Sequence, residues 1–398
     1  MRRTVWIAAA LVGCLAVVGA IALYTPGSGL HAPNTGRGAT YAVVRVLYAT
    51  DRGRSGGTTP AVMFGDGRAD MSYGFCDVSI PRDHRMGELE APSIRRLEFR
   101  EDPNKHVVVL ETEVQAKDEF LGDLAARVRA DPNDSAFLFV HGYNTTFDAA
   151  AKRTAQMSYD LGFTGAPVFY SWPSRGTLKG YVVDEQNVEW AQADLKDFLG
   201  DFLARSEARN VYVISHSMGS RALTRAVASL LTEKPALRDR VKEVILAAPD
   251  IDASVFKRDI APSLAAQGLP VTLYASSRDK ALLASKKAHG YPRAGESGSD
   301  LVVVPGIDTV DASKVSCDFI GHWLLRREPF GHRRYVPDHP RWEASRRSLQ
   351  AAPSRLPVGT ALGIPTVASR STHAARRQTT VSSGRYKRIT RSAHAGSG

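Results

Sequence analysis

The chain has 398 residues, which is more than a single core usually needs and fewer than three domains would take. A hydrophobic content of 43% and a charged content of 23% are typical of a globular protein. The net charge of +11 resides in the segment after residue 325, which alone carries a net +12, so the body of the chain is nearly neutral. Three cysteines are too few for a disulfide framework.

The chain opens on an apolar segment preceded by two arginines. The uninterrupted apolar run from Val5 to Leu23 spans 19 residues, just enough to cross a hydrocarbon core as a helix. Residues 1–24 are therefore predicted to be an uncleaved anchor, a signal peptide cut after Ala22, or a lipoprotein leader with Cys14 as the lipidated residue. All three export the chain to the bacterial cell envelope. They argue against nucleic acid as a partner, and they make the membrane a partner if the segment is retained or lipidated.

Residues 25–40 are rich in Gly, Pro, Ser and Thr and are predicted to form a flexible linker. Beyond them, short apolar runs typical of strands alternate with stretches in which apolar residues recur at helical spacing. The predicted strands are 41–52, 105–114, 136–140, 166–172, 211–214, 243–248, 270–276 and 301–304. The predicted helices lie at 147–161, at 187–206 and directly after Ser217.

This alternation predicts an α/β domain in which helices cover both faces of a mostly parallel sheet, from about residue 41 to residue 325. Residues 326–398 are dominated by Arg, Ser, Ala and Pro and are predicted to be a basic, disordered tail. Cys76 and Cys317 remain in the exported part. The sequence leaves open whether they form a disulfide or stay free thiols.

A candidate nucleophile follows the strand predicted at 211–214, in the stretch "VYVISHSMGS". A serine that sits on a sharp turn between a buried strand and a helix has its hydroxyl presented to a substrate. The turn demands small residues two places before and two places after the nucleophile. Gly219 meets this demand, and Ser215 stands where the first glycine of Gly-x-Ser-x-Gly usually stands. We therefore expect Ser217 to be the nucleophile and Ser215 to be a tolerated small residue.

Such a nucleophile also needs backbone N–H groups aimed at the negative charge that develops on the attacked carbonyl. The N–H of Met218 is one candidate, because it lies in the same turn. The other should come from a loop that follows an earlier strand, and "FLFVHGYNTTF" (137–147) fits. There Gly142, Tyr143 or Asn144 could present the second donor. The side chain of His141 is expected to be hydrogen-bonded within that loop for structural reasons.

Several of these motifs together resemble a known family. They are "VHGYNTTF", "SWPS", "SHSMG" and "LAAPDID", with "YATDR" and "GFCDVSIPRDHRMGELE" upstream. In combination they resemble the bacterial α/β-hydrolase family DUF900, formerly of unknown function, which belongs to the esterase/lipase superfamily. The resemblance covers about residues 41–325. It implies the α/β-hydrolase fold and a catalytic triad in the order Ser, acid, His.

The acid should follow a late strand, and Asp279 lies just past the strand predicted at 270–276, in a pattern similar to the family's. Its expected role is to orient the base and to stabilise the base's charged form. Asp250 and Asp252, after the preceding strand, are the alternative acids. Carboxylates at such positions also serve as helix caps.

The base should be a histidine after the acid. His322 stands in a Gly-His pair that resembles the family's Gly-His near the end of the sheet. His289 and His332 are the alternatives. His289 lies close to Asp279 in sequence, and His332 already belongs to the basic stretch.

The chain departs from the fold's usual ending after His322. An amphipathic helix normally closes the sheet there, whereas this sequence continues as "RREPFGHRRYVPDHPRWEASRR". One hypothesis is a frame change in the coding sequence, and the absence of a family-like closing helix in any alternative frame would argue against it.

Taken together, the sequence predicts a serine hydrolase that cleaves a small or lipid-like carboxylic ester through an acyl-enzyme. Residues 174–186 could cover the site. No metal-ligand spacing, phosphate-binding loop or dinucleotide fingerprint occurs, so no metal or cofactor is expected. The alternative from another class is a catalytically idle hydrolase fold that serves as a scaffold or binding module of the envelope.

Overall fold

The computed structural model describes residues 41–313, with the exceptions of 58, 278, 280, 281, 283, 284 and 286–288. The predicted leader, linker and basic tail lie outside the described residues, as do Cys14, Cys317, His322 and His332. Among the described residues, none of the helices combines the length and the apolar character that a membrane crossing requires.

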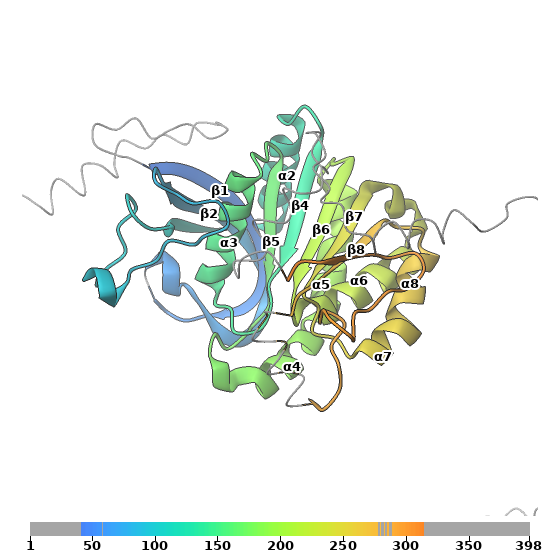
Figure 1. Cartoon of the computed structure of the whole chain (residues 1–398). Helices are drawn as coiled ribbons and strands as arrows, with labels where there is room; N and C mark the ends of the chain where they lie inside the picture. The colour runs from blue at the N-terminus through green and yellow to red at the C-terminus, as the bar shows by residue number, and fades with distance from the viewer. Residues whose placement is uncertain are drawn as a thin grey trace, which may run out of the picture. The chain divides into compact units, whose positions relative to one another are not determined.

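The domain is built on a single nine-stranded sheet whose order is β3-β2-β1-β5-β4-β6-β7-β8-β9 (Figure 1). The strands are β1 (Tyr41–Arg54), β2 (Phe64–Pro81), β3 (Val108–Gln115), β4 (Ser135–Val140), β5 (Ala166–Ser171), β6 (Asn210–His216), β7 (Val241–Ala247), β8 (Val271–Ala275) and β9 (Asp308–Asp311). β2 runs antiparallel to both of its neighbours, and the other pairings are parallel.

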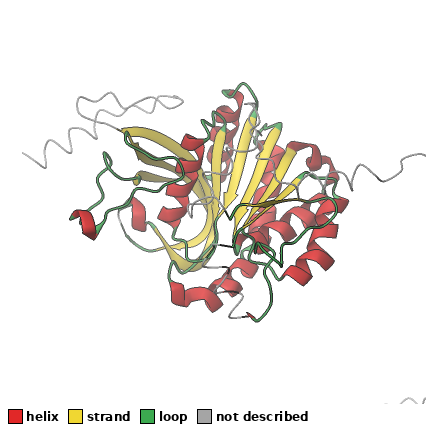
Figure 2. Cartoon of the chain, in the orientation of Figure 1, coloured by secondary structure: helices red, strands yellow, loops and turns green. Residues whose placement is uncertain are grey.

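Helices cover both faces of this sheet (Figure 2). They are α2 (Lys117–Arg129), α3 (Phe147–Asp160), α4 (Tyr181–Trp190), α5 (Gln192–Arg205), α6 (Gly219–Glu233), α7 (Ala253–Val255) and α8 (Ala261–Ala266); short helical turns η1 (Pro60–Val62), η2 (Ile94–Arg96), η3 (Leu178–Gly180), η4 (Pro235–Arg240) and η5 (Phe256–Ile260) complete the list. One core joins α2, α5, α6 and α8 to one face of the sheet, and a second core joins α3 to the other face.

The helices form because their apolar residues recur on one side. In α5, for example, Leu195, Phe198, Leu199 and Phe202 follow the i, i+3, i+4, i+7 spacing of a single helix face, and all four are buried. The central strands are buried along their whole length, as expected for strands covered on both faces.

The strand order reverses at β4, and this reversal positions the site. The chain goes from β4 to β5 on one side, and it then returns past β4 to β6 on the other side. At such a topological switch point the connections diverge, and a crevice opens beyond the carboxyl ends of the strands. The loops that follow β4 and β6 therefore meet at this edge, which we call the catalytic edge because the predicted nucleophile, Ser217, directly follows β6.

The alternation of strands and helices predicted from the sequence is confirmed, although α2, α7 and α8 were not predicted and three further points are corrected. The prediction of a strand at 301–304 is wrong. The last strand among the described residues is β9, and Val302 lies buried in a loop, where its carbonyl accepts a hydrogen bond from the Thr309 hydroxyl. The four residues of β9 are polar or half-exposed. This edge strand therefore contains no apolar run from which it could be predicted.

The helix predicted at 187–206 is two helices, α4 and α5, separated at Ala191. The 18-residue strand β2 was not predicted, because glycines and charged residues interrupt its apolar residues. Cys76 lies on β2 as a fully buried thiol beside Thr112.

Candidate active site

Ser217 occupies a strained turn between β6 and α6. Its φ is +48°, a left-handed conformation that residues other than glycine rarely adopt. Its N–H donates to the carbonyl of Ala247 (2.9 Å), and its own carbonyl accepts from the N–H of Asp250 (3.1 Å). These bonds to the end of β7 hold the strained turn in place. This is the strand–turn–helix geometry of a nucleophile elbow.

The residues around Ser217 meet the size demand of the turn. A Cβ on Gly219 would lie 2.2 Å from the carbonyl oxygen of His141, so this position accepts only glycine without a backbone shift. Ser215 is fully buried, and its hydroxyl lies 2.9 Å from that of Ser220 at the start of α6. The serine in place of the first glycine therefore joins β6 to α6 by a side-chain hydrogen bond.

Gly219→Ala is expected to destabilise the fold by about 1–3 kcal/mol, since β4 and α6 must separate to admit the methyl group. Urea denaturation would measure the loss. Gly122→Ala is the matched control, because a Cβ there meets nothing within 4 Å and lies in the exposed part of α2. It should raise stability by about 0.5–1 kcal/mol. Equal effects of the two substitutions would contradict the steric explanation.

The loop after β4 lies directly against Ser217. A Cβ on Gly142 would stand 2.9 Å from the Cβ of Ser217 and 2.8 Å from Nδ1 of His216, so the glycine allows the two turns to meet. The N–H of Asn144 donates to the buried carboxylate of Asp184 (3.3 Å). Of the loop N–H groups suggested by the sequence, those of Gly142 and Tyr143 remain as candidate oxyanion donors.

His141 fixes the orientation of the peptide that carries the Tyr143 N–H. Its Nε2 faces the guanidinium of Arg52, which can only donate, so Nε2 accepts and Nδ1 carries the proton. Nδ1 then donates to the carbonyl of Gly142 (2.9 Å). In a trans peptide the N–H points opposite to the C=O, so the Tyr143 N–H points away from His141. Burial and the charge of Arg52 hold the pKa of His141 well below its usual value, which keeps the ring neutral.

Arg52 anchors this arrangement from the end of β1. It is buried, and its five N–H donors reach Ser171 Oγ, His141 Nε2 and the carbonyls of Gly65, Thr145 and Ser174. Burial lowers the pKa of Arg52 to about 10, so the side chain is still charged at neutral pH. Sequence reasoning did not single out Arg52. The sequence feature that could have indicated its role is a charged residue at the end of an apolar strand.

The structure brings Asp279 to the catalytic edge. One carboxylate oxygen lies 3.7 Å from Nε2 of His216, the residue before Ser217, and the other accepts from the N–H of Leu282 (3.0 Å). The Asp279 side chain is mostly buried. It therefore lies close to the elbow while holding its own loop in place.

Asp250, one of the two alternative acids, is fully engaged by other groups. One of its oxygens accepts from Ser285 and from Arg293 (both 2.6 Å), and the other accepts from Tyr181 (2.6 Å) and from Arg221 (3.2 Å). Burial alone would raise the pKa of Asp250, but the two guanidinium groups outweigh it and lower this pKa. Asp252, the other alternative, caps α7 by accepting from the N–H groups of Ser254 and Val255.

The candidate bases are placed only in part. His289 is held between the carbonyl of Ser285 (2.8 Å) and the carboxylate of Glu185 (2.9 Å). His322 and His332 lie outside the described residues. The last described residue, Ser313, accepts a hydrogen bond from the N–H of Ser277 (2.9 Å), so the chain that continues to His322 leaves from beside the Asp279 loop.

The segment expected to cover the site forms η3 and the start of α4, which lies below the sheet in the view of Figure 1. Arg221 of α6 joins α4 through Glu185 (2.7 Å) and the hydroxyl of Tyr181 (3.1 Å). The Tyr143 hydroxyl donates to the carbonyl of Leu178. These bonds fasten the segment to the catalytic edge. In the described part of the chain, no three His, Cys, Asp or Glu side chains gather as a metal site.

Three solved structures share a distant likeness with the chain. A predicted CIB-like hydrolase from Thermoplasma acidophilum is 19% identical, over 46% of this chain and 78% of its own, with a TM-score of 0.26. Lipase B from Aspergillus fumigatus is 15% identical, over 57% and 55%, with a TM-score of 0.28. An inhibited esterase B from Lactobacillus rhamnosis is 11% identical, over 67% and 75%, with a TM-score of 0.26. Likenesses of this size say nothing about the substrate.

No curated protein matches the chain. The family DUF900, described as an alpha/beta hydrolase of unknown function, matches residues 116–323. The matched span contains Ser217, Asp279 and His322 as well as the loop after β4. Because it covers just over half of the chain, this protein belongs to the DUF900 family of α/β-hydrolases.

Proposed function

We propose that the protein hydrolyses carboxylic esters through an acyl-enzyme formed on Ser217. The observation that carries this proposal is the left-handed turn at Ser217, packed against a loop whose Tyr143 N–H is turned away from His141. A strained non-glycine conformation persists only where the surrounding structure enforces it, and such strain is concentrated at functional sites.

In the first step the Ser217 oxygen bonds to the ester carbonyl carbon, and His322 takes the hydroxyl proton. The negative charge on the carbonyl oxygen is stabilised by the N–H groups of Met218 and Tyr143. Collapse of this intermediate breaks the ester bond, and the departing alkoxide receives the proton from His322. Water then attacks the acyl-enzyme with His322 again as the base, which releases the acid and restores Ser217.

Asp279 is the acid that orients His322 in this proposal. Two contacts support it: the carboxylate lies next to His216 beside the elbow, and the chain toward His322 leaves from the neighbouring loop. His322 lies nine residues after Ser313, the last described residue, and within the span matched by the family. Asp250 is the weaker candidate, because two arginines already neutralise it.

A fluorophosphonate probe tests the proposal, since it reacts with an activated serine and leaves an idle one unlabelled. We expect the wild type to be labelled and Ser217→Ala to be unlabelled. Ser254→Ala, at an exposed serine beyond β7, serves as the matched control and should be labelled like the wild type. Labelling that survives in Ser217→Ala would show another nucleophile. A folded wild type that neither labels nor hydrolyses esters of several acyl lengths would support a scaffold role instead.

A further inference from the structure

The connection between β2 and β3 carries an exposed apolar turn. Residues 94–100, which we call the tip, include Ile94, Leu97 and Phe99, whose exposed fractions are 79%, 77% and 76%. Single exposed apolar residues are common on protein surfaces, but three large ones within six positions are not. Such a cluster marks a surface that contacts something else.

The tip has a defined backbone. The N–H groups of Arg96 and Glu98 both donate to the carbonyl of Ser93, and the N–H of Leu97 donates to that of Ile94. Leu97 is held at φ +58°, a conformation that a leucine rarely adopts. The apolar side chains are therefore displayed by a hydrogen-bonded turn.

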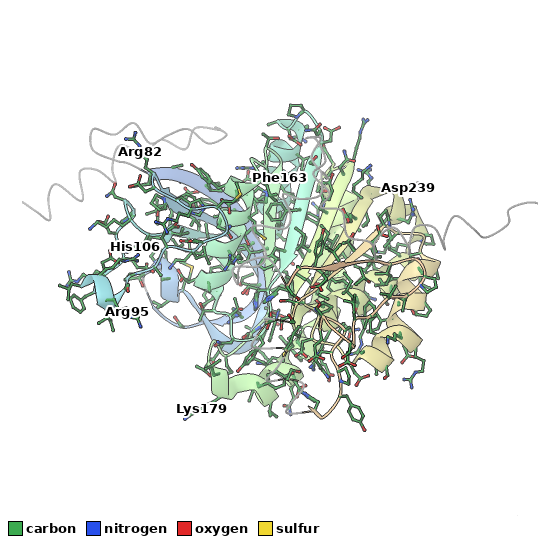
Figure 3. The ribbon with its side chains drawn as sticks, in the orientation of Figure 1. Arg82, Arg95, His106, Phe163, Lys179 and Asp239 are labelled. Atoms are coloured by element: carbon green, nitrogen blue, oxygen red, sulfur yellow. The ribbon has the colours of Figure 1, made fainter. Side chains whose placement is uncertain are left out.

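Basic side chains accompany these apolar ones. Arg95, Arg96 and Arg100 are exposed, and the one acidic residue of the tip, Glu98, accepts from Arg96 and contacts His106. The tip thus has a net charge of +2. Figure 3 shows Arg95 at the outer side of the domain, well away from Lys179 beside α4.

The chain enters the domain next to this connection. Tyr41, the first residue of β1, pairs with Pro81, the last residue of β2, and the connection begins one residue later. The predicted apolar segment Val5–Leu23 precedes Tyr41 by a linker that, if extended, spans about 55 Å. A domain tethered in this way keeps the tip within reach of the membrane surface.

We propose that the tip docks the domain on an anionic lipid surface of the cell envelope. Ile94, Leu97 and Phe99 enter the boundary between headgroups and acyl chains, and the three arginines pair with lipid phosphates. The combination of apolar and basic side chains matches the chemistry of that boundary. Docking through the tip leaves the catalytic edge uncovered, and the proposal is independent of the reaction at Ser217.

The test uses the full chain reconstituted in phosphatidylcholine vesicles, with or without phosphatidylglycerol, and a phospholipid with a photoreactive acyl chain. Flotation first confirms that the protein is on the vesicles. Adducts are then mapped by mass spectrometry. We expect adducts within residues 94–100 on the anionic vesicles, and roughly a hundredfold fewer on the neutral ones, where the three arginines lack anionic lipid.

Two variants separate the contributions of the basic and the apolar side chains to docking. Changing Arg95, Arg96 and Arg100 to Gln should reduce tip docking by about fivefold for each arginine removed. Changing Ile94 and Phe99 to Ser and Leu97 to Asn should abolish the adducts, and Asn tolerates the left-handed conformation at position 97. Val303→Ser, at an exposed valine outside the tip, is the control and should leave the adducts unchanged.

Protein that floats with anionic vesicles but forms no adducts within residues 94–100 would overturn the proposal. Equal adduct yields on neutral and anionic vesicles would overturn the role of the arginines. Cross-links from the tip to a second copy of the chain, in place of lipid adducts, would assign the tip to self-association.

Discussion

Asp279→Asn is expected to lower kcat for ester hydrolysis by about 10⁴-fold, because an amide neither selects the productive tautomer of the base nor stabilises its charged form. The fold should be little affected. Asn keeps an oxygen that can accept from the N–H of Leu282, the bond that holds the Asp279 loop. Steady-state kinetics together with urea denaturation would separate the catalytic effect from any loss of folded protein.

Asp252→Asn provides the matched control for that experiment. It makes the same chemical change at a carboxylate that also follows a strand of the catalytic edge, and Asn remains a good cap for α7. Both kcat and stability should stay close to those of the wild type. If Asp279→Asn retained activity within tenfold of the wild type, Asp279 would not be the triad acid.

The sequence was sufficient to predict the elbow, because local patterns determine it. A buried apolar strand, a serine and a small residue two places later specify a strand–turn–helix unit, and glycine is required at 219 because a Cβ there would lie 2.2 Å from the carbonyl oxygen of His141. The central parallel strands were predicted for a similar reason: covered on both faces, they appear as unbroken apolar runs. β9 and the first half of β2 are more exposed, and the second half of β2 is buried but contains Gly, Asp and Ser among its apolar residues, so neither strand appears as an unbroken apolar run.

The surroundings of Ser217 were beyond sequence reasoning because they depend on contacts between distant segments. Arg52 donates a hydrogen bond to the carbonyl of Ser174, 122 residues later in the chain, and no local sequence pattern indicates such a bond. Asp250 presented a similar problem. A carboxylate after a strand looks the same in the sequence whether it is a triad acid or the centre of an ion-pair cluster, and only the positions of Arg221 and Arg293 distinguish the two.

Asp250→Asn is expected to destabilise the protein by about 3–5 kcal/mol, because it removes the buried carboxylate that pairs with Arg293 and leaves Arg221 with Glu185 alone. Only 2% of Asp250 is exposed, so water cannot replace the lost charge. The cluster also joins α4, α6 and the segment around Ser285. Chemical denaturation at neutral pH would measure the loss, with Asp252→Asn again as the nearby control.

The pH dependence of this difference tests its electrostatic origin. The folded-state pKa of Asp250 is lowered, so its contribution to stability is fully present above the unfolded pKa of about 4 and disappears as the pH falls through the folded-state value. The gap between wild type and Asp250→Asn should therefore be constant near neutrality and should shrink in acid. A gap that did not change with pH would point to lost packing. A fully stable but inactive Asp250→Asn would instead move the catalytic acid from Asp279 to Asp250.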